Sequence, residues 1–217
     1  MSFANVGGWL LLAAYLSLVL EMTVFAIPSE ASTLQILAKS EAAAGGSLAR
    51  ARAHHLLSKV LRYFLPTAVG VLLFVLPLFV AIFPGLRDYV LCPVDTGYLG
   101  LVVGLAMVVL GRLVTFTAVL QLRRRLHPGT HALQRHGIFR FSRNPILLGM
   151  YLFYLGNAVW LPSPLLWVGF LLYAGNMHRR VLMEEGYLSN RFGDDYRAYL
   201  AEVPRYVGLS GEGAGSR

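Results

Sequence analysis

The sequence predicts an all-α integral membrane protein with about five transmembrane helices, the last two paired as a hairpin, and an amphipathic cytoplasmic helix at the C-terminal end. Apolar residues make up 56% of the 217 residues and charged residues only 14%, whereas a soluble domain carries roughly 25% charged residues. The mean hydropathy is +0.59. The apolar residues also gather into runs of about 20, the length that a spanning helix needs.

Three apolar runs predict the first three spans. They cover Gly8–Ile27, Tyr63–Phe83 and Tyr98–Leu122. We expect the first span to be permanent, because no basic segment of the kind that opens a signal peptide precedes it. Glu21 and Arg112 lie inside the first and third spans. Charges within spans are functional candidates, and the simpler explanation is that these two pair with each other or snorkel.

The fourth apolar run, residues 145–177, is interrupted by Pro162 and Pro164. A proline lacks the backbone N–H and clashes with the preceding helical turn. The run therefore predicts a tight hairpin of two short helices, Pro145–Trp160 and Pro164–Met177.

An amphipathic stretch, His178–Ala201, follows the hairpin, with apolar residues at helical spacing. Gly193 is expected to break it, and Asp194 or Asp195 to cap a second short helix. We expect one domain over residues 1–207. Its spans up to residue 122 would form the substrate side, its residues 123–206 the cofactor-binding and catalytic region, and residues 208–217 a flexible tail.

Loop charges orient the predicted spans. The segments 28–62 and 123–144 are rich in arginine and lysine, and 84–97 is not. The positive-inside rule then puts these two basic loops and the C-terminus in the cytoplasm, with the N-terminus and Cys92 outside. We expect a bacterial inner membrane as the location. The net charge of +8 is assigned to orientation and contact with anionic lipid rather than to nucleic acid.

Polar residues concentrate at the predicted cytoplasmic ends of the last two spans. Arg140 and Arg143 precede Asn144-Pro145, where a helix begins. Free N–H groups at such a start suit a carboxylate or a phosphate, although these residues are also ordinary flanks of a span.

A second polar group leaves the last span, with His178, Arg180, Glu184 and Glu185. Arg180 and Glu184 are four residues apart, so they share a helix face and can pair. The simpler alternative is a surface salt bridge.

Several site classes find no support in the sequence. The single cysteine excludes a disulfide within the chain. Pro128-Gly129 separates His127 from His131, which argues against a zinc-binding helix, and we predict no metal. P-loop, Rossmann and nucleophile-elbow patterns are also missing.

Two stretches resemble a known family. They read His131-Ala-Leu-Gln-Arg-His136-Gly137-Ile-Phe139-Arg-Phe-Ser-Arg143-Asn144-Pro145-Ile-Leu-Leu148-Gly149 and Glu184-Glu185-x-x-Leu188-x-x-x-Phe192-Gly193-x-x-Tyr196-x-x-Tyr199-x-x-x-Val203-Pro204-Arg205. The sequence is similar to the isoprenylcysteine carboxyl methyltransferases and phospholipid methyltransferases, which are integral-membrane enzymes that use S-adenosylmethionine. The likeness covers about residues 120–206.

The resemblance implies a cofactor pocket roofed by the cytoplasmic loop. The cofactor-binding residues would be His131, Ala132, Leu133, Gln134, Phe139, Asn144, Pro145, Leu147 and Glu184. Arg143, Arg180 and Glu185 would be catalytic. Arg180 matches a position that faces the substrate carboxylate, and Glu185 or Glu184 would accept a proton from an amine acceptor.

The acceptor stays open at this point. Asn144 stands where the carboxyl methyltransferases usually have His, and Leu147 where they usually have Tyr. The acceptor is therefore an isoprenylcysteine-like carboxylate, a phospholipid amine or a small thiol, reached from the lipid bilayer. The alternatives to a methyltransferase are an NADPH-dependent reductase of sterol-reductase-like architecture and a non-enzymatic membrane sensor or carrier.

Overall fold

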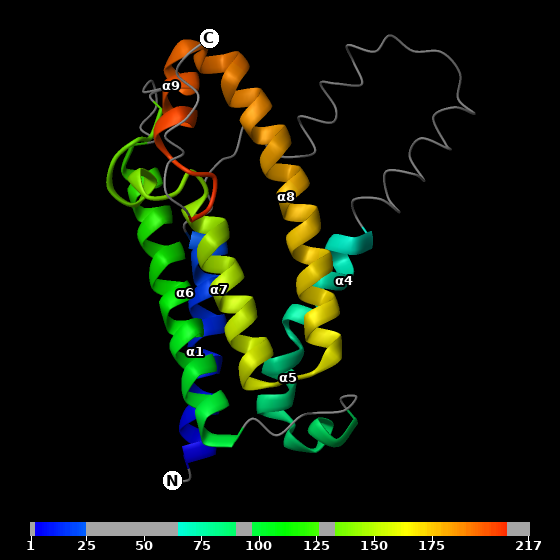
Figure 1. Cartoon of the computed structure of the whole chain (residues 1–217). Coiled ribbons are helices and arrows are strands. Elements are labelled where there is room, and N and C mark those ends of the chain that lie inside the picture. Colours follow the sequence, from blue (N-terminus) through cyan, green and yellow to red (C-terminus); the bar gives the residue numbers. More distant parts are fainter. Residues whose placement is uncertain (1–2, 25–64, 90–96, 126–132, 208–217) are drawn as a thin grey trace, which may run out of the picture.

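The computed structural model describes residues 3–24, 65–89, 97–125 and 133–207, and all regular structure in these ranges is helical. The helices are α1 (Phe3–Val24), α4 (Leu65–Phe74), α5 (Leu76–Ile82), η2 (Pro84–Tyr89), α6 (Gly97–Arg125), η3 (Gly137–Arg140), α7 (Pro145–Trp160), α8 (Pro164–Phe192) and α9 (Asp194–Glu202). Helices α1, α6 and α7 lie side by side, α8 packs with α4, and η3 and α9 gather at the end far from the N-terminus (Figure 1). We call that end the cap. The loop 28–62, Cys92 and the tail 208–217 lie outside the described residues.

One described helix is long and apolar enough to cross a membrane, over Gly97–Arg123. Shorter apolar helices lie at Gly7–Glu21, Ala68–Ile82 and Pro145–Trp160. The all-α class predicted from the sequence is confirmed for the described residues, and the topology with five spans stays a prediction.

The second predicted span is not one continuous helix. It breaks at Val75 between α4 and α5, because Pro77 has no N–H to continue the helical ladder. The N–H of Leu78 donates to the carbonyl of Val75 and not to that of Phe74. The hydroxyl of Tyr15 on α1 donates to the freed Phe74 carbonyl at 2.5 Å, so the break is joined to the neighbouring helix.

The hairpin has the predicted bounds at its turn. Helix α7 runs from Pro145 to Trp160, and α8 begins at Pro164. The sequence prediction was wrong about the other end of α8, which continues past Met177 to Phe192 without a break. No proline interrupts this stretch, and its leucine, methionine, glutamate and arginine residues favour a helix.

Gly193 separates α8 from α9, as predicted, with a φ of +55° that suits glycine best. Its position is also the N-cap of α9, so the prediction that Asp194 or Asp195 caps this helix was wrong. Both aspartates lie in the first turn instead, where negative charge interacts favourably with the helix dipole.

Helices α6 and α7 make the most extensive contact among the described elements. Gly104 and Gly111 of α6 face Gly156 and Gly149 of α7. A Cβ added to Gly104 would come within 2.7 Å of the Gly156 carbonyl, and one added to Gly111 within 2.6 Å of the Gly149 carbonyl. Small residues at matched positions thus let the two backbones touch.

Buried aromatic rings fill the space where α1, α4 and α7 meet. The rings of Tyr15, Phe74 and Phe153 lie 5.0–5.4 Å apart between centroids. Tyr154 adds a ring 5.1 Å from Phe74, and its hydroxyl donates to the carbonyl of Gly70 on α4. These contacts join α7 to α1 and α4 and fix the direction in which α7 presents its first turn.

The two charges predicted inside the spans pair with each other. A guanidinium nitrogen of Arg112 on α6 lies 2.5 Å from a carboxylate oxygen of Glu21 on α1, and Nε of Arg112 donates to Ser17 Oγ at 2.9 Å. Both ionised side chains are less than 10% exposed. Pairing, the simpler of the two explanations, is therefore confirmed.

Candidate active site

The described residues 133–144, which include the helix η3, lead into α7 at the cap. Gly137 has a φ of +67°, which favours glycine, and the next residue, Ile138, donates its N–H to Gln121 Oε1 on α6 at 3.0 Å. Phe139 is buried, and its carbonyl accepts a hydrogen bond from the hydroxyl of Tyr199 on α9 at 2.8 Å. The loop is thereby held between α6 and α9.

The start of α7 is joined to the chain that follows α9, residues Val203–Val207, which we call the C-terminal strap. The N–H of Arg143 donates to the Pro204 carbonyl at 3.0 Å. The Arg205 carbonyl accepts from Asn144 Nδ2 at 3.2 Å and from Ser142 Oγ at 3.3 Å. Asn144 therefore uses its side chain to hold the strap and not to cap its own helix.

Glu185 of α8 lies between two arginines. Arg205 of the strap donates to both of its carboxylate oxygens, at 3.0 and 2.7 Å, and a guanidinium nitrogen of Arg143 lies 3.3 Å from one of them. The side chains of Arg143 and Glu185 are only 10% and 12% exposed. Hydrogen bonding to Glu185 is the main cause that raises the pKa of Arg205. This triad connects the start of α7, the end of α8 and the strap.

Two buried tyrosines of α9 lie beside this triad. Burial, followed by the charge of Glu185, raises the pKa of Tyr196 to about 12, and the charge of Arg143 acts in the opposite direction. Burial likewise raises the pKa of Tyr199 to about 12 against the lowering effect of Arg143 and Arg135. Both hydroxyls therefore stay protonated and act as hydrogen-bonding groups near neutral pH.

The outer part of α8 carries the other predicted polar residues. Arg180 and Glu184 are both exposed. The protein packed around the Glu184 carboxylate reduces its hydration and raises its pKa, Arg180 lowers that pKa by its charge, and Glu185 raises it. His178 contacts the strap, with Nδ1 2.9 Å from the Tyr206 hydroxyl.

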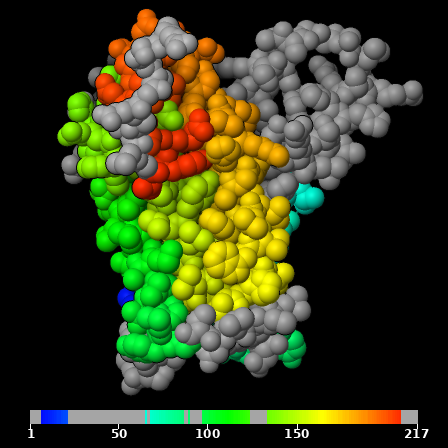
Figure 2. All heavy atoms as spheres, in the orientation of Figure 1, coloured from blue at the N-terminus to red at the C-terminus, as the bar shows by residue number. Residues whose placement is uncertain are grey.

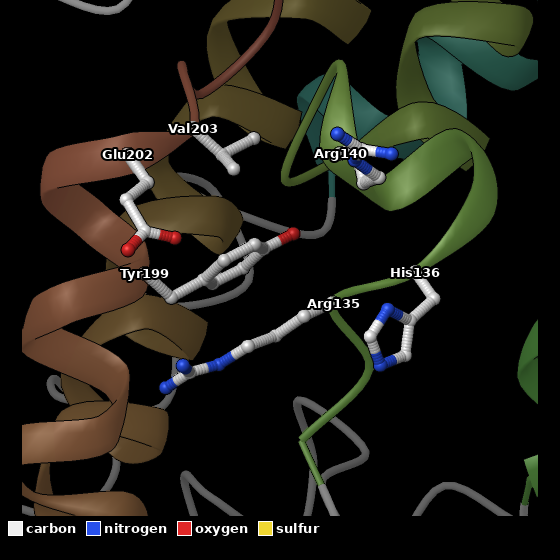
Figure 3. Close-up of a pocket in the computed structure, with 6 residues that line it drawn as sticks. All are labelled: Arg135, His136, Arg140, Tyr199, Glu202 and Val203. Carbon is white, nitrogen blue, oxygen red and sulfur yellow. The ribbon is translucent and has the colours of Figure 1, made fainter.

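A cavity of about 460 Å³ opens in the cap. Its lining comes from the loop before η3, from η3 and from the end of α9, namely Arg135, His136, Arg140, Tyr199, Glu202 and Val203. Figure 3 shows Tyr199, Glu202 and Val203 facing Arg135 and His136 across this space. The mixture of two guanidiniums, an imidazole and a carboxylate suits a small ligand that carries charges of both signs.

The structure brings together some of the predicted site residues. Arg143, Asn144 and Glu185 meet at the strap, and Leu133 packs against the buried tyrosines of α9. Gln134 donates to the carbonyl of His136, whose side chain lines the cavity. Pro145 is buried in the first turn of α7, with Leu147 half-buried beside it.

Arg180 and Glu184 do not line the cavity described above, and His131 and Ala132 lie outside the described residues. The roles of all these residues stay predictions.

Sequence reasoning did not assign a role to the strap or to Arg135. The motif Val203-Pro204-Arg205 was visible in the sequence, but its contacts join residues about sixty positions apart. Arg135 directly follows the predicted cofactor-binding residues 131–134, and Arg140, which also lines the cavity, was already noted in the sequence.

Comparisons with known proteins agree on one class. A sequence model of the family described as phospholipid methyltransferase matches residues 99–195. The chain is 31% identical over 130 residues to a probable protein-S-isoprenylcysteine O-methyltransferase of Oryza sativa subsp. indica, which covers 56% of the chain and 64% of that protein. It is 29% identical over 115 residues to protein-S-isoprenylcysteine O-methyltransferase B of Arabidopsis thaliana, covering 48% of the chain and 57% of that protein.

A bacterial relative is shorter. An uncharacterized protein of Haemophilus influenzae is 33% identical over 61 residues, which are 28% of the chain and 97% of that protein. The chain spans less than two thirds of the length of the plant relatives that it matches.

Proposed function

We propose that this chain, which matches a phospholipid methyltransferase family model and is similar to isoprenylcysteine methyltransferases, is an integral-membrane enzyme that moves a methyl group from S-adenosylmethionine to a lipophilic acceptor. One observation carries the proposal. The family match over residues 99–195 encloses every residue that the sequence predicted for cofactor binding and catalysis, from His131 to Glu185.

The cap offers groups that fit such a donor. When bound, S-adenosylmethionine supplies a methyl group on a positively charged sulfur, which is attacked in line. A cavity of about 460 Å³ falls in the usual range for small-molecule sites, roughly 300–1,000 Å³. Arg135 and Arg140 would face its carboxylate, Glu202 its ammonium or ribose hydroxyls, and Leu133, Gln134 and Phe139 would form the neighbouring wall.

The protein's contribution to such a transfer is alignment and exclusion of water. Tyr196 and Tyr199 are buried in the cap. Figure 2 shows the red surface of α9 and the strap beside the orange surface of α8 and above the yellow-green surface of α7. A lipophilic acceptor would approach along the helices from the bilayer, while the donor would enter from the water-exposed cap.

The contacts of Glu185 favour an acceptor that is already an anion. Its carboxylate accepts two hydrogen bonds from Arg205 and faces Arg143, so both of its oxygens are already engaged by guanidinium groups and do not face an acceptor. A carboxylate or thiolate acceptor needs no base. For an amine acceptor Glu184, whose pKa is raised, would be the better base.

The topology is also a proposal. We infer five spans in a bacterial inner membrane, with the N-terminus outside and the cap in the cytoplasm. Support comes from α6, which is long and apolar enough to cross a membrane, and from the contrast between the basic segment 123–144 at its end and the segment 84–97 before it, which is not basic. A label on Cys92 is expected to react from outside intact cells, and reaction only after lysis would mean the inverted orientation.

The donor is tested by calorimetry on detergent-solubilised protein, with S-adenosylmethionine and NADPH compared. Heat with the methyl donor and none with NADPH is expected. The reverse result would favour the reductase, and heat with neither would favour a sensor or carrier.

Turnover is then measured with two acceptors, an S-farnesylated N-acetylcysteine and phosphatidylethanolamine, and the first is expected to be methylated faster. Glu202→Ala removes the carboxylate that lines the cavity and should lose most of the donor affinity, while Asp194→Ala, at a side chain that is 96% exposed on α9, should keep it. Unchanged affinity in Glu202→Ala would mean that the donor does not contact this carboxylate.

A further inference from the structure

Arg205 and Arg143 both contact Glu185, but with different numbers of contacts and at different distances. Arg205 makes a bidentate pair with both carboxylate oxygens, at 3.0 and 2.7 Å. Arg143 approaches only one oxygen, at 3.3 Å. Two parallel N–H···O bonds are the stronger arrangement, so Glu185 is primarily the partner of Arg205.

Arg143 is left with unused donor capacity. Its side chain is only 10% exposed, and its Nε–H is buried with no hydrogen-bond partner in the described part of the chain. The triad of Arg143, Glu185 and Arg205 carries two positive charges and one negative charge. A buried guanidinium in this state attracts an anion, because leaving a buried charged donor unsatisfied is costly.

The strap holds Arg205 at a defined place. Its carbonyl is fixed to Asn144 and Ser142 at the start of α7, and the next residue, Tyr206, contacts His178 on α8. The guanidinium of Arg205 therefore reaches Glu185 from a backbone that is anchored on both helices. Without that guanidinium, Glu185 would have Arg143 as its nearest cation.

Arg143 also lies close to the proposed donor site. Its charge acts on the pKa of Tyr199, which lines the cavity, and the first strap residue, Val203, lines it as well. A carboxylate bound at Arg143 would thus sit beside the cavity.

We propose that Arg205 is a positioning residue that takes the bidentate contact with Glu185 and leaves Arg143 only one contact to that carboxylate, so that Arg143 can bind a ligand carboxylate. The inference rests on the proposed methyl transfer. It assigns Arg143 as the residue that binds the carboxylate of the donor or of the acceptor. Arg205 acts only through Glu185 and Arg143. Its loss should let Glu185 neutralise Arg143.

The test uses a rescue that a purely structural role would not produce. Arg205→Met is expected to weaken S-adenosylmethionine binding by about tenfold or more, as measured by calorimetry. The double variant Arg205→Met with Glu185→Gln should regain most of that affinity, because the neutral amide no longer neutralises Arg143. The matched control Arg197→Met removes an exposed arginine from α9 and should bind like the wild type.

A second arm identifies the source of the carboxylate. If it belongs to the donor, Arg205→Met should weaken binding of S-adenosylmethionine but not of its decarboxylated analogue. If it belongs to the acceptor, the KM for S-farnesylated N-acetylcysteine should rise about tenfold while donor binding stays constant. Either result supports the proposal. No change in both quantities, or a double variant that does not restore the quantity that Arg205→Met changed, would overturn it.

A third arm separates this inference from the proposed function. If the wild type binds no methyl donor, acetate serves as a bare carboxylate, and its shift of the thermal midpoint is measured. A larger shift for the wild type than for both Arg205→Met and Arg143→Met supports the carboxylate site even then. Equal shifts in all three proteins would refute it.

Discussion

The contact between α6 and α7 and the junction in the cap are held together by opposite means. Along α6 and α7 glycines face glycines, and the two backbones approach with no side chain between them. In the cap, Arg143, Glu185 and Arg205 are joined by charges and hydrogen bonds. If α6 and α7 lie in lipid as proposed, their apolar side chains gain little by leaving those surroundings, so close packing must supply the attraction. In the cap, polar groups are satisfied by each other.

Glu21 and Arg112 form a charged contact within the helix bundle, where the other contacts described above are made by close packing. Breaking this pair is the change for which we expect the largest loss of stability. Glu21→Leu leaves a buried guanidinium that already has one unpartnered nitrogen among the described residues. We expect a loss of about 3–5 kcal/mol in the free energy of unfolding, measured by chemical denaturation in micelles.

The control for that experiment is the double variant Glu21→Leu with Arg112→Met. It removes both charges and should recover most of the stability. Wild-type stability in the single variant would show that water reaches the pair.

A second variant tests the close approach of α6 and α7. Gly111→Ala would bring a Cβ within 2.6 Å of the Gly149 carbonyl and the Phe153 nitrogen, and neither backbone atom can move without shifting its helix. Overpacking of this kind costs about 1–3 kcal/mol, which should lower the thermal midpoint.

Gly175→Ala is the matched control, because an added Cβ there meets nothing within 4 Å. Alanine favours a helix over glycine, so this variant should equal or exceed the wild type in thermal stability. A similar loss in both variants would mean that the α6–α7 contact is looser than described.

A third variant tests the hydrogen bond that bridges the break at Val75. Tyr15→Phe removes the donor to the Phe74 carbonyl, which the helical ladder does not satisfy. We expect the free energy of unfolding to fall by about 1–2 kcal/mol, measured by chemical denaturation in micelles. Tyr89→Phe, at a position 85% exposed, should change nothing, and equal stability of both variants would argue that another donor replaces Tyr15.

The smallest effect is expected at the surface of α9. Arg197 and Asp194 form an ion pair at 3.0 Å, but their side chains are 69% and 96% exposed. Solvent and salt screen such pairs, so Arg197→Met should leave the thermal midpoint within experimental error. A clear drop would show that even exposed charges stabilise the cap.

The sequence predicted helix starts and ends correctly where a single residue determines the local backbone conformation. Pro145 and Pro164 set the starts of α7 and α8, and Gly193 ends α8, because proline and glycine restrict or free the backbone whatever surrounds them. The break at Pro77 carried the same kind of signal and was overlooked. Arg143, Asn144 and Glu185 were found as candidates from the motif that contains them.

The partners of those candidates could not be found in this way. Asn144 was expected beside a cofactor and also holds the carbonyl of Arg205, 61 residues away. Glu185 was expected to be catalytic and accepts hydrogen bonds from the strap. Spacing along one helix shows which residues share a face, and it says nothing about which distant segment returns to that face.

The sequence by itself determined the all-helical class, the hairpin and the set of polar residues at its open end, because composition, proline and glycine act locally. Only the tertiary structure decided that Glu21 pairs with Arg112, that glycines face one another across α6 and α7, and that Arg205 rather than Arg143 is the closer partner of Glu185. These contacts depend on the distances between helices. Packing of the whole bundle sets those distances, and they cannot be read from any single stretch of the chain.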